Sequence, residues 1–279
     1  MPVKIVTDSV SDIPADIVKE LGITVIPVLV RFGEEVYRDG VDITTDQFYD
    51  RLVHSKFLPA TSVPAPAVFA ETYDRLAEET DEILVITVTS KLSGIHDTAL
   101  QSIGLMKRKC RVEVMDSQWA VMPQGFIVMK AAQAAQAGAS FDEVLDVVRR
   151  HIPRVDMRAA LDTLEYLKKG GRIGRAEALF GSMLRVKPII TLKEGIVEPA
   201  GLARSRTKAM DLLYKFAASY SHIEELAIEA SACPEDRDVL IERLSTIFPK
   251  ERIYRSGTTP VIGTYTGPGL LLVAVLGDK

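Results

Sequence analysis

Two short segments of the sequence gather serine and threonine hydroxyls beside residues that bend the chain. Thr61 and Ser62 stand before two prolines and a predicted helix, and Ser93 and Gly94 close a loop that leaves a predicted strand at 83–88. Hydroxyls and free backbone N–H groups near a helix N-terminus are typical of an anion site. Capping by Ser62 explains part of the first segment, so a structural role and a binding role are both open there.

A third group of hydroxyls lies near the end of the chain. Residues 261–270 carry three glycines and a proline together with Thr264, Tyr265 and Thr266. This composition predicts a tight turn between two apolar strands. A plain hairpin needs few donors, so we favour a site in which Tyr265 is a neutral hydrogen-bond donor.

Three arginines stand in positions that helix capping does not explain. Arg172 follows a predicted helix and two glycines, and it is a candidate contact for carboxylate or phosphate. Arg204 and Arg206 form a small basic patch near a strand-to-helix passage. Such patches are commonly solvated faces, and contact with a partner protein or a phosphorylated ligand is the alternative.

Asp8 ends the first predicted strand, and polar residues follow it. Carboxylates that leave a parallel strand can line a ligand or cation site, which makes Asp8 a candidate support for the site. The structural alternative is that Ser11 or Asp12 caps a helix that begins at Pro14.

An enzymatic role would need a nucleophile and a base. Ser93 has His96 three residues on, but it does not stand in a Gly-x-Ser-x-Gly turn, and the chain has no Walker A sequence. We therefore expect a binding protein with no catalytic residue, metal site or cofactor. A Ser-dependent hydrolase or a phosphotransferase is the alternative.

The elements that would position these residues follow two patterns. In residues 1–153, short β-branched runs at 4–6, 23–30, 83–88 and 112–115 alternate with predicted helices at 45–54, 66–79, 94–107, 123–137 and 141–150. This alternation predicts an α/β domain with a mainly parallel sheet. Residues 154–279 begin with helical segments and continue with strands at 187–191, 195–199, 226–230, 252–255 and 270–276. We expect an α+β domain there, with the ligand at the interface of the two domains.

Composition narrows the class of protein. A net charge of -4 offers no basic excess for a nucleic acid, and no apolar run is long enough to span a membrane. The two cysteines are far apart in sequence, and the first residues leave no room for a signal peptide. We expect a soluble cytoplasmic protein.

The ordered set of motifs resembles the DegV family, the fatty-acid-binding subunits of bacterial fatty-acid kinases. The resemblance covers essentially the whole chain and rests on pieces that run from the N-terminus to the C-terminus: Thr7-Asp8-Ser9, Thr61-Ser62, Leu92-Ser93-Gly94, Lys169-Gly170-Gly171-Arg172, Arg204 with Arg206, and Gly263-Thr264 with Gly267-Pro268-Gly269. Many members that look like kinase subunits carry His where this chain has Tyr265, and a tyrosine does not become cationic.

The resemblance implies a long-chain fatty acid, for example palmitate, in a buried tunnel. It implies that Thr61, Ser62 and Ser93 hold the carboxylate, and that a separate kinase subunit phosphorylates it with help from Arg172, Arg204 or Arg206. The roughly fourteen methylenes of a sixteen-carbon acid would contribute on the order of 11 kcal/mol on burial before association costs. The tail would therefore set affinity, and uncharged hydroxyls would orient the head near an opening.

Overall fold

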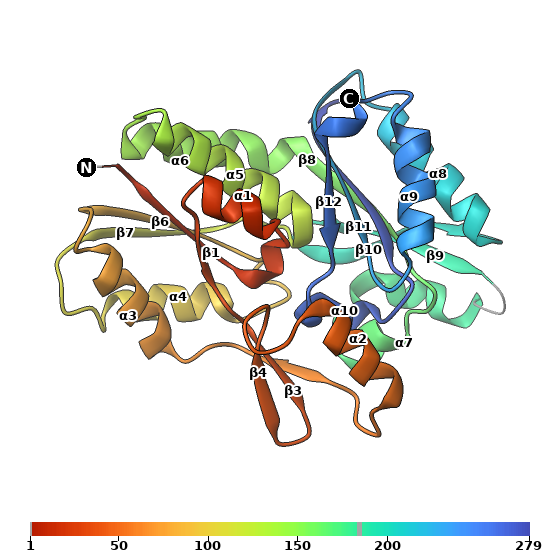
Figure 1. The fold of residues 1–279 in the computed structure, drawn as a ribbon, viewed down its shortest axis with the longest axis horizontal. Coiled ribbons are helices and arrows are strands. Elements are labelled where there is room, and N and C mark those ends of the chain that lie inside the picture. Colours follow the sequence, from red (N-terminus) through yellow and green to blue (C-terminus); the bar gives the residue numbers. More distant parts are fainter. Residues whose placement is uncertain (1, 183–185) are drawn as a thin grey trace.

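The computed structural model describes residues 2–182 and 186–279, and it shows two lobes side by side (Figure 1). The first lobe is built on a parallel sheet of four strands in the order β2-β1-β6-β7. Its strands are β1 (Lys4–Asp8), β2 (Thr24–Ile26), β6 (Glu82–Thr87) and β7 (Arg111–Asp116). β1 and β6 are buried along most of their length, as apolar runs of parallel strands require.

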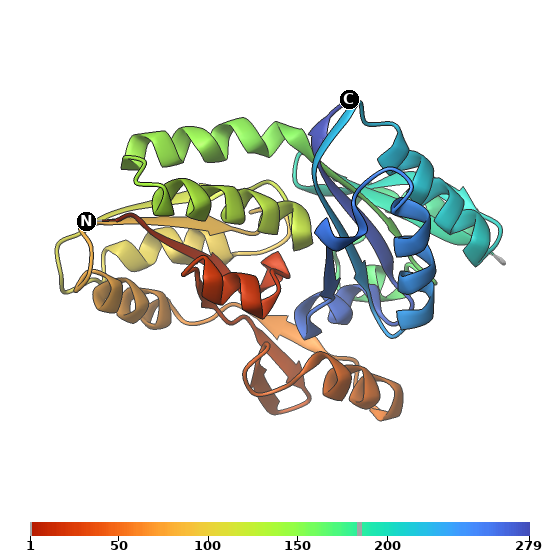
Figure 2. The ribbon, with the colours of Figure 1, turned by 45° about the horizontal axis from the view of Figure 1, so that its top comes forward.

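Helices cover both faces of this sheet (Figure 2). Helices α3 and α4 lie on one face, and the long α5 packs on the other with α6 beside it. The helices of this lobe are α1 (Ala15–Glu20), α3 (Pro66–Leu76), α4 (Ile95–Ile103), α5 (Val121–Gln136) and α6 (Phe141–His151), with the short 3-10 helices η1 (Ser9–Ser11) and η2 (Ile152–Arg154). Helix α6 begins with a capping box from Ser140 and Glu143.

The second lobe is built on a six-stranded sheet in the order β10-β9-β8-β13-β11-β12. Its neighbouring strands are antiparallel except for the parallel pair β11–β12. The strands are β8 (Val155–Ala160), β9 (Lys187–Lys193), β10 (Ile196–Ala203), β11 (His222–Ala230), β12 (Ile253–Gly257) and β13 (Leu271–Asp278). Helices α8 (Arg206–Ala218) and α9 (Pro234–Leu244) cover its outer face (Figure 1).

A small third layer joins the lobes from below. The three-stranded sheet β4-β3-β5 and helix α2 come from the first half of the chain, and α10 of the second half packs against them (Figure 1). These elements are β3 (Leu29–Phe32), β4 (Glu35–Arg38), β5 (Ala60–Ser62), α2 (Thr45–His54) and α10 (Pro260–Thr266). The remaining short helices are α7 (Glu165–Lys169), η3 (Gly174–Ser182) and η4 (Lys250–Arg252).

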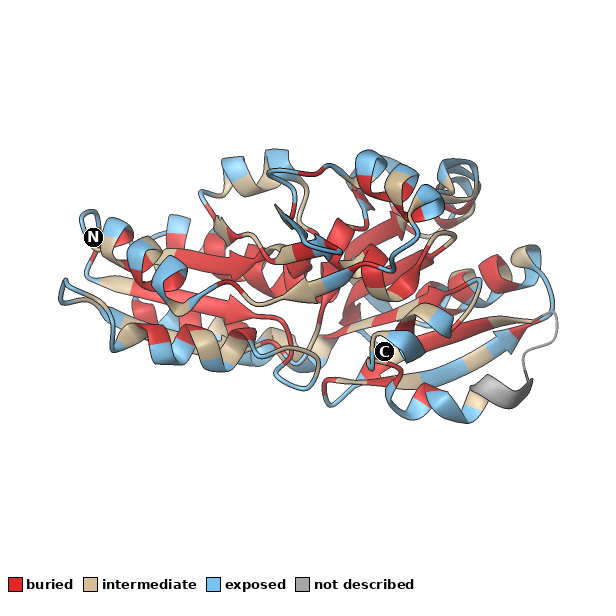
Figure 3. Ribbon diagram, turned by 90° about the horizontal axis from the view of Figure 1, so that it is seen from below, coloured by how far each residue is buried: buried red, intermediate tan, exposed pale blue. Residues whose placement is uncertain are grey.

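The hydrophobic core crosses the lobe interface (Figure 3). Strand β13 shows why: its residues are buried on both faces, and successive side chains point to opposite sides. Leu272 and Ala274 belong to the cluster shared with the first lobe, whereas Val273 and Val275 pack in a separate cluster under α8 and α9. The inner face of the second sheet thus forms one wall of the interface.

The predicted fold class is confirmed, and several local predictions are wrong. The single strand expected at 23–30 is two strands, β2 and β3, in different sheets, because Pro27 lies between them and lacks an N–H for a sheet ladder. The second half begins with the strand β8, which was not predicted, and the expected helical segments follow it as α7 and η3. The predicted boundary between the two domains, at 153/154, lies just before β8, and this boundary stays a prediction.

Two predictions about turns and caps are also wrong. The turn expected at 261–270 is largely helix α10, and the tight bend is confined to its end, where Gly267 and Gly269 have positive φ. Neither Ser11 nor Asp12 caps α1, because the N-cap position of this helix is occupied by Pro14. Asp8 instead caps η1 by accepting the Val10 N–H, and Asp12 ends η1 in the left-handed region. Just beyond α7, Gly171 takes the left-handed conformation with a φ of 70°.

Candidate functional site

An apolar cavity lies between the two lobes. The space open to the centre of a water-sized sphere is about 110 Å³. Its walls come from both halves of the chain and are almost entirely aliphatic, with Val28, Val88 and Ile95 on one side and Ala159, Leu192 and Leu272 on the other. The few polar residues of the lining, Thr61, Ser93, Arg172, Tyr265 and Thr266, come from four separate segments of the chain. An enclosed apolar space with a small number of convergent polar groups is the usual form of a small-molecule site.

Thr61 and Tyr265 meet at this cavity although they lie far apart in sequence. The Thr61 Oγ1 and Tyr265 Oη atoms are 2.5 Å apart, and either hydroxyl can be the donor. One bond between two hydroxyls uses one proton, so the pair keeps one O–H for a ligand. Thr61 belongs to strand β5, and Tyr265 belongs to helix α10. The packing of α10 against β5 therefore brings the two hydroxyls together.

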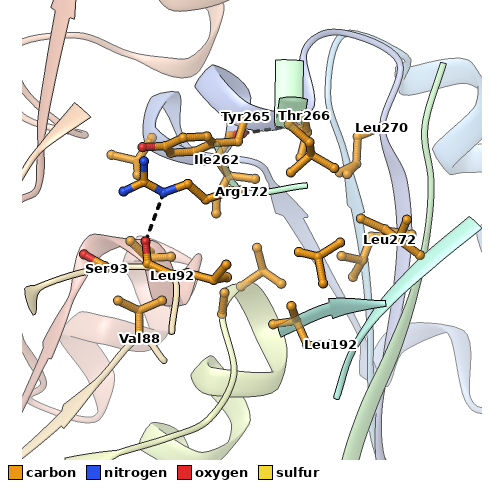
Figure 4. Close-up of a pocket in the computed structure, with 18 of the residues that line it drawn as sticks. Val88, Leu92, Ser93, Arg172, Leu192, Ile262, Tyr265, Thr266, Leu270 and Leu272 are labelled. Carbon is orange, nitrogen blue, oxygen red and sulfur yellow. Dashed lines mark hydrogen bonds between the residues drawn. The ribbon is translucent and has the colours of Figure 1, made fainter. Parts of the chain in front are cut away.

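Arg172 adds a positive charge at the same place (Figure 4). Its Nε donates to the Leu92 carbonyl at 3.1 Å, its Nη1 donates to the Gly170 carbonyl at 2.9 Å, and its guanidinium lies 5.1 Å from the centre of the Tyr265 ring. Nη2 has no protein partner among the described residues and is left to bind an anion. Arg172 was predicted as a possible contact for carboxylate or phosphate, and it lines the same cavity as the hydroxyls of Thr61, Ser93 and Tyr265.

Ser93 lies across from Tyr265, on the loop between β6 and α4 (Figure 4). Its Oγ accepts the Ile95 N–H at 3.3 Å, which leaves its own proton available. His96 does not approach this oxygen as a base would: its Nδ1 lies 3.3 Å from Thr87 Oγ1. Ser93 is therefore arranged as a donor rather than as an activated nucleophile.

Ser62 and Gly94, which the sequence also suggested, do not line the cavity. Neighbouring residues of a strand point to opposite sides, so Ser62 faces away from the side that Thr61 faces. Gly94 is exposed and forms the N-cap of α4. A Cβ at Gly94 would be 3.9 Å from Val63 Cγ2, which shows that the two hydroxyl loops are neighbours.

Asp8 supports the site without lining it. Its carboxylate accepts the Val10 N–H at 3.1 Å, the Val88 N–H at 2.8 Å and Gln124 Nε2 at 3.3 Å. Val10 and Val88 line the cavity, so Asp8 fixes two of its walls. Burial raises the pKa of Asp8 to about 6, although these hydrogen bonds oppose the rise.

Arg204 and Arg206 lie away from the cavity lining. Arg204 is exposed, and it has no hydrogen-bond or ion-pair partner within residues 2–182 and 186–279. Arg206 is engaged: its guanidinium binds Asp236 at 2.6 Å, the Gly269 carbonyl at 2.6 Å and Cys233 Sγ at 3.0 Å. The geometry gives Arg206 a structural role and leaves Arg204 as the free cation of this pair.

A second, more polar pocket adjoins the charged corner. It is about 220 Å³ by the same measure, and Thr61, Arg172 and Tyr265 line both this pocket and the cavity. Leu58, Lys169 and Thr264 complete part of its wall. The three shared residues therefore stand as a partition between the apolar cavity and a polar opening.

A cluster of buried acids lies elsewhere at the lobe interface. Asp12, Asp39 and Glu229 are each at most 3% exposed, and each has one buried carboxyl oxygen without a hydrogen-bond partner among the described residues. Burial, with the adjacent Glu229 carboxylate, raises the pKa of Asp12 well above its usual range. Burial raises the pKa of Asp39 and of Glu229 to about 7 each. A proton on Asp12 or Glu229 would supply a donor that two ionised carboxylates lack.

This cluster also supports the cavity wall. Glu229 Oε1 accepts the Met122 N–H at 2.8 Å. The preceding residue, Val121, lines the cavity with a φ of 55°, a conformation that costs a β-branched residue roughly 1–3 kcal/mol. Neither these acids nor the wall residues of β8 and β9 were predicted as part of the site. The alternation of Val155, Met157 and Ala159 with polar residues was the available signal for β8.

Two further properties are defined over residues 2–182 and 186–279. No group of three or more His, Cys, Asp or Glu side chains is arranged to hold a metal ion there. The helices of that part of the chain are all too short or too polar to cross a membrane.

Together the fold and the site define a two-lobed α/β protein that encloses an apolar cavity with one cationic, hydroxyl-lined corner. The sequence profile described as "Uncharacterised protein, DegV family" matches residues 2–278. A DegV domain-containing protein of Streptomyces coelicolor is 36% identical over 98% of each chain, and the protein DegV of Bacillus subtilis is 30% identical over 97% of this chain and 98% of its own. The chain belongs to the DegV family.

Solved structures of similar proteins share the whole fold. A DegV family protein from Thermus thermophilus, described for its fatty acid binding, superimposes with a TM-score of 0.92 at 33% identity over 99% of this chain and 100% of its own. DegV of Bacillus subtilis, described as a fatty acid binding protein, gives 0.91 at 29% identity over 99% of each chain.

Proposed function

We propose that this protein binds one long-chain fatty acid, with the tail in the interlobe cavity and the carboxylate at Thr61, Ser93, Arg172 and Tyr265. The observation that carries the proposal is that the polar residues of an otherwise aliphatic cavity are mainly hydrogen-bond donors. Relatives of the same fold that are described as fatty acid binding proteins support it.

The head and the tail contribute differently. A carboxylate at the corner would accept from Arg172 Nη2, from Ser93 and from the spare proton of the Thr61–Tyr265 pair. Charge-assisted hydrogen bonds contribute about 1.5 to 3 kcal/mol each, and desolvation of the carboxylate offsets part of this. Burial of a palmitate tail would contribute on the order of 11 kcal/mol before association costs, so the tail sets affinity and the corner sets orientation.

The polar pocket beside the corner suggests what happens to the bound acid. A carboxylate held by Thr61, Arg172 and Tyr265 would face this pocket from the partition that they form. We propose that a separate kinase subunit enters there and transfers the terminal phosphoryl group of ATP to a carboxylate oxygen, forming an acyl phosphate and releasing ADP, with Arg172 neutralising the added charge. The exposed Arg204 is the candidate contact for that subunit. Both proteins would act in the cytoplasm.

Lipid extraction tests the binding step. Protein purified without delipidation should release about one fatty acid per chain, as measured by mass spectrometry after solvent extraction. Protein unfolded in denaturant, washed and refolded should be free of lipid and should take up added palmitate again. An extract without stoichiometric fatty acid, together with no uptake by the refolded sample, would refute the proposal.

The rival function is intrinsic catalysis at Ser93. The position of His96 against Thr87 favours binding over hydrolysis, because no base then contacts the Ser93 hydroxyl in the part of the chain that the structure describes. Ester turnover and ATP turnover by the isolated protein measure the rival directly. Turnover that disappears in Ser93→Ala would favour the enzyme.

A further inference from the structure

The far end of the cavity lies against a seam in the second sheet. Strands β8 and β9 are paired at Ala159↔Ile190 and Ala160↔Ile189, at one end of the six-residue strand β8. Further along, side chains bridge the two strands: Arg158 Nη1 donates to Thr191 Oγ1 at 3.1 Å, and Thr191 Oγ1 donates to Asp156 at 3.2 Å. Between residues 155–158 of β8 and the facing part of β9, the two strands are therefore not paired through backbone hydrogen bonds.

Met157 and Leu192 stand at the seam on the cavity side. Extending the antiparallel register from Ala159↔Ile190 by two residues sets Met157 opposite Leu192. Both line the cavity, and they are 5% and 4% exposed. Leu192 lies across the cavity from Tyr265 and so from the charged corner (Figure 4).

A separate groove begins on the other side of the seam. It is about 560 Å³ by the measure used for the cavity, and it spans both lobes, with Trp119 on one side and Asp156, Arg158 and Lys193 on the other. Leu192 lines the groove as well as the cavity. On the first lobe, the boundary between the groove and the cavity lies between two consecutive residues: Trp119 lines the groove, and Ala120 lines the cavity.

Hydrogen bonds from Thr89 hold the boundary between the cavity and the groove, where the β9–β10 hairpin meets the first lobe. The Thr89 N–H donates to the Trp119 carbonyl at 2.8 Å, and Thr89 Oγ1 donates to the Gly195 carbonyl at 3.4 Å. Gly195 turns the β9–β10 hairpin with a φ of 78°, where a side chain would meet Thr89. The hairpin that carries Leu192 is thus seated against the first lobe beside Trp119.

We propose that the cavity has a second opening at this seam and that Leu192 closes it, so that Leu192 sets the longest acyl chain that the protein accepts. The inference rests on the proposed fatty acid binding and adds a specificity-determining residue to it. Where a smaller side chain replaces Leu192, a longer tail would pass position 192 and lie in the groove beside Trp119. Shorter tails would end against Leu192 and Met157.

Competition among acids of different length tests the role of Leu192. Wild type, Leu192→Ala and Leu192→Trp are delipidated and incubated with an equimolar mixture of saturated acids of about 14 to about 22 carbons, and native mass spectrometry measures the bound lengths. Leu192→Ala should shift the distribution to longer acids, with a gain of about fourfold for each methylene that it newly buries. Leu192→Trp should shift it to shorter acids.

Ile189→Ala is the matched control. Ile189 lies on the same strand but packs in the cluster beneath α8 and α9, so its loss should destabilise the sheet without changing chain-length preference. Equal distributions for wild type, Leu192→Ala and Leu192→Trp would overturn the role of Leu192. If wild type binds no acid of any length, the proposed function itself fails, which is a different result from binding without a length shift.

Discussion

The lobe interface holds two polar regions of opposite character. The corner of the cavity, formed by Thr61, Ser93, Arg172 and Tyr265, has donors to spare. The acid cluster has acceptors to spare, since Asp12, Asp39 and Glu229 each keep an unpartnered oxygen among the described residues. A donor-rich corner is suited to an anionic ligand, whereas acceptor-rich carboxyls are satisfied by protons that they share.

This difference indicates that the corner binds a ligand, whereas the acid cluster stabilises the contact between the lobes. The corner can receive a carboxylate without moving a proton, because its cation and hydroxyls already line the cavity. The acid cluster instead links the lobes: Asp12 accepts from the Thr259 N–H at 3.3 Å, and Glu229 holds the backbone next to Val121. The following changes should affect one region and spare the other.

The largest effect is expected from pH. Asp8, Asp39 and Glu229 hold their protons more tightly in the folded protein, where their pKa values are about 6, 7 and 7, than in the unfolded chain, where they are near 3.8, 3.8 and 4.5. Their stabilisation is therefore complete below about pH 4 and is lost as pH rises through 6 to 7, with Glu229 alone contributing about 3 kcal/mol. Urea unfolding of the delipidated protein should show lower stability at pH 8 than at pH 5.

Glu229→Gln is the control for that titration. The amide keeps an acceptor for the Met122 N–H and can donate to Asp12, but it does not ionise. The stability difference between pH 5 and pH 8 should shrink by about 3 kcal/mol in this variant. An unchanged difference would mean that Glu229 is not protonated in the folded protein.

Arg172→Gln should give the next largest effect, and it should act on binding. Loss of a charge-assisted hydrogen bond of about 1.5 to 3 kcal/mol weakens affinity by roughly tenfold to a hundredfold. Displacement of a fluorescent fatty acid measures this loss. Arg204→Gln removes an exposed arginine outside the cavity and should bind as wild type does, and equal affinities in the two variants would contradict the cationic corner.

Tyr265→Phe should weaken binding less. A neutral hydrogen bond contributes about 1 kcal/mol, or roughly fivefold in affinity. Because Tyr265 and Thr61 share one bond, Thr61→Val combined with Tyr265→Phe should cost less than the sum of the two single changes. Strictly additive losses in a double-mutant cycle would show that the two hydroxyls act independently.

Ser62→Ala should have the smallest effect. Ser62 follows Thr61 in β5 and does not line the cavity, so affinity should stay within about twofold of wild type. A loss comparable to that of Tyr265→Phe would place Ser62 at the ligand after all. The same displacement assay serves for this comparison.

The sequence predicted the parts of this site better than their arrangement. Thr61, Ser93, Tyr265 and Arg172 were singled out because hydroxyls, glycines and an arginine stood where helix and turn rules left them unexplained. Their convergence depends on α10 packing against β5, a contact between segments about 200 residues apart that no local pattern records. The approach of Arg172 to the Tyr265 ring depends on tertiary packing in the same way.

The buried acids show a second limit. Asp12 resembled a helix cap in sequence, because capping residues and buried structural acids share the same residue types. Glu229 follows the apolar run Leu226–Ile228 in β11, and a buried acid at that point signals that a tertiary partner exists without identifying it. The fold class followed from the alternation of strands and helices, whereas the break at Pro27 and the strand β8 were missed although each has a local signal: a proline that cannot donate to a sheet ladder, and the apolar alternation of Val155, Met157 and Ala159.

A crystal structure with an ω-brominated fatty acid tests the central claim most directly, because anomalous scattering locates the bromine independently of the head. The carboxylate should lie within hydrogen-bonding distance of Arg172, Ser93 and the Thr61–Tyr265 pair, with the bromine inside the aliphatic cavity toward Leu192 or Leu272. A carboxylate elsewhere on the protein, or a bromine peak outside the interlobe cavity, would contradict it.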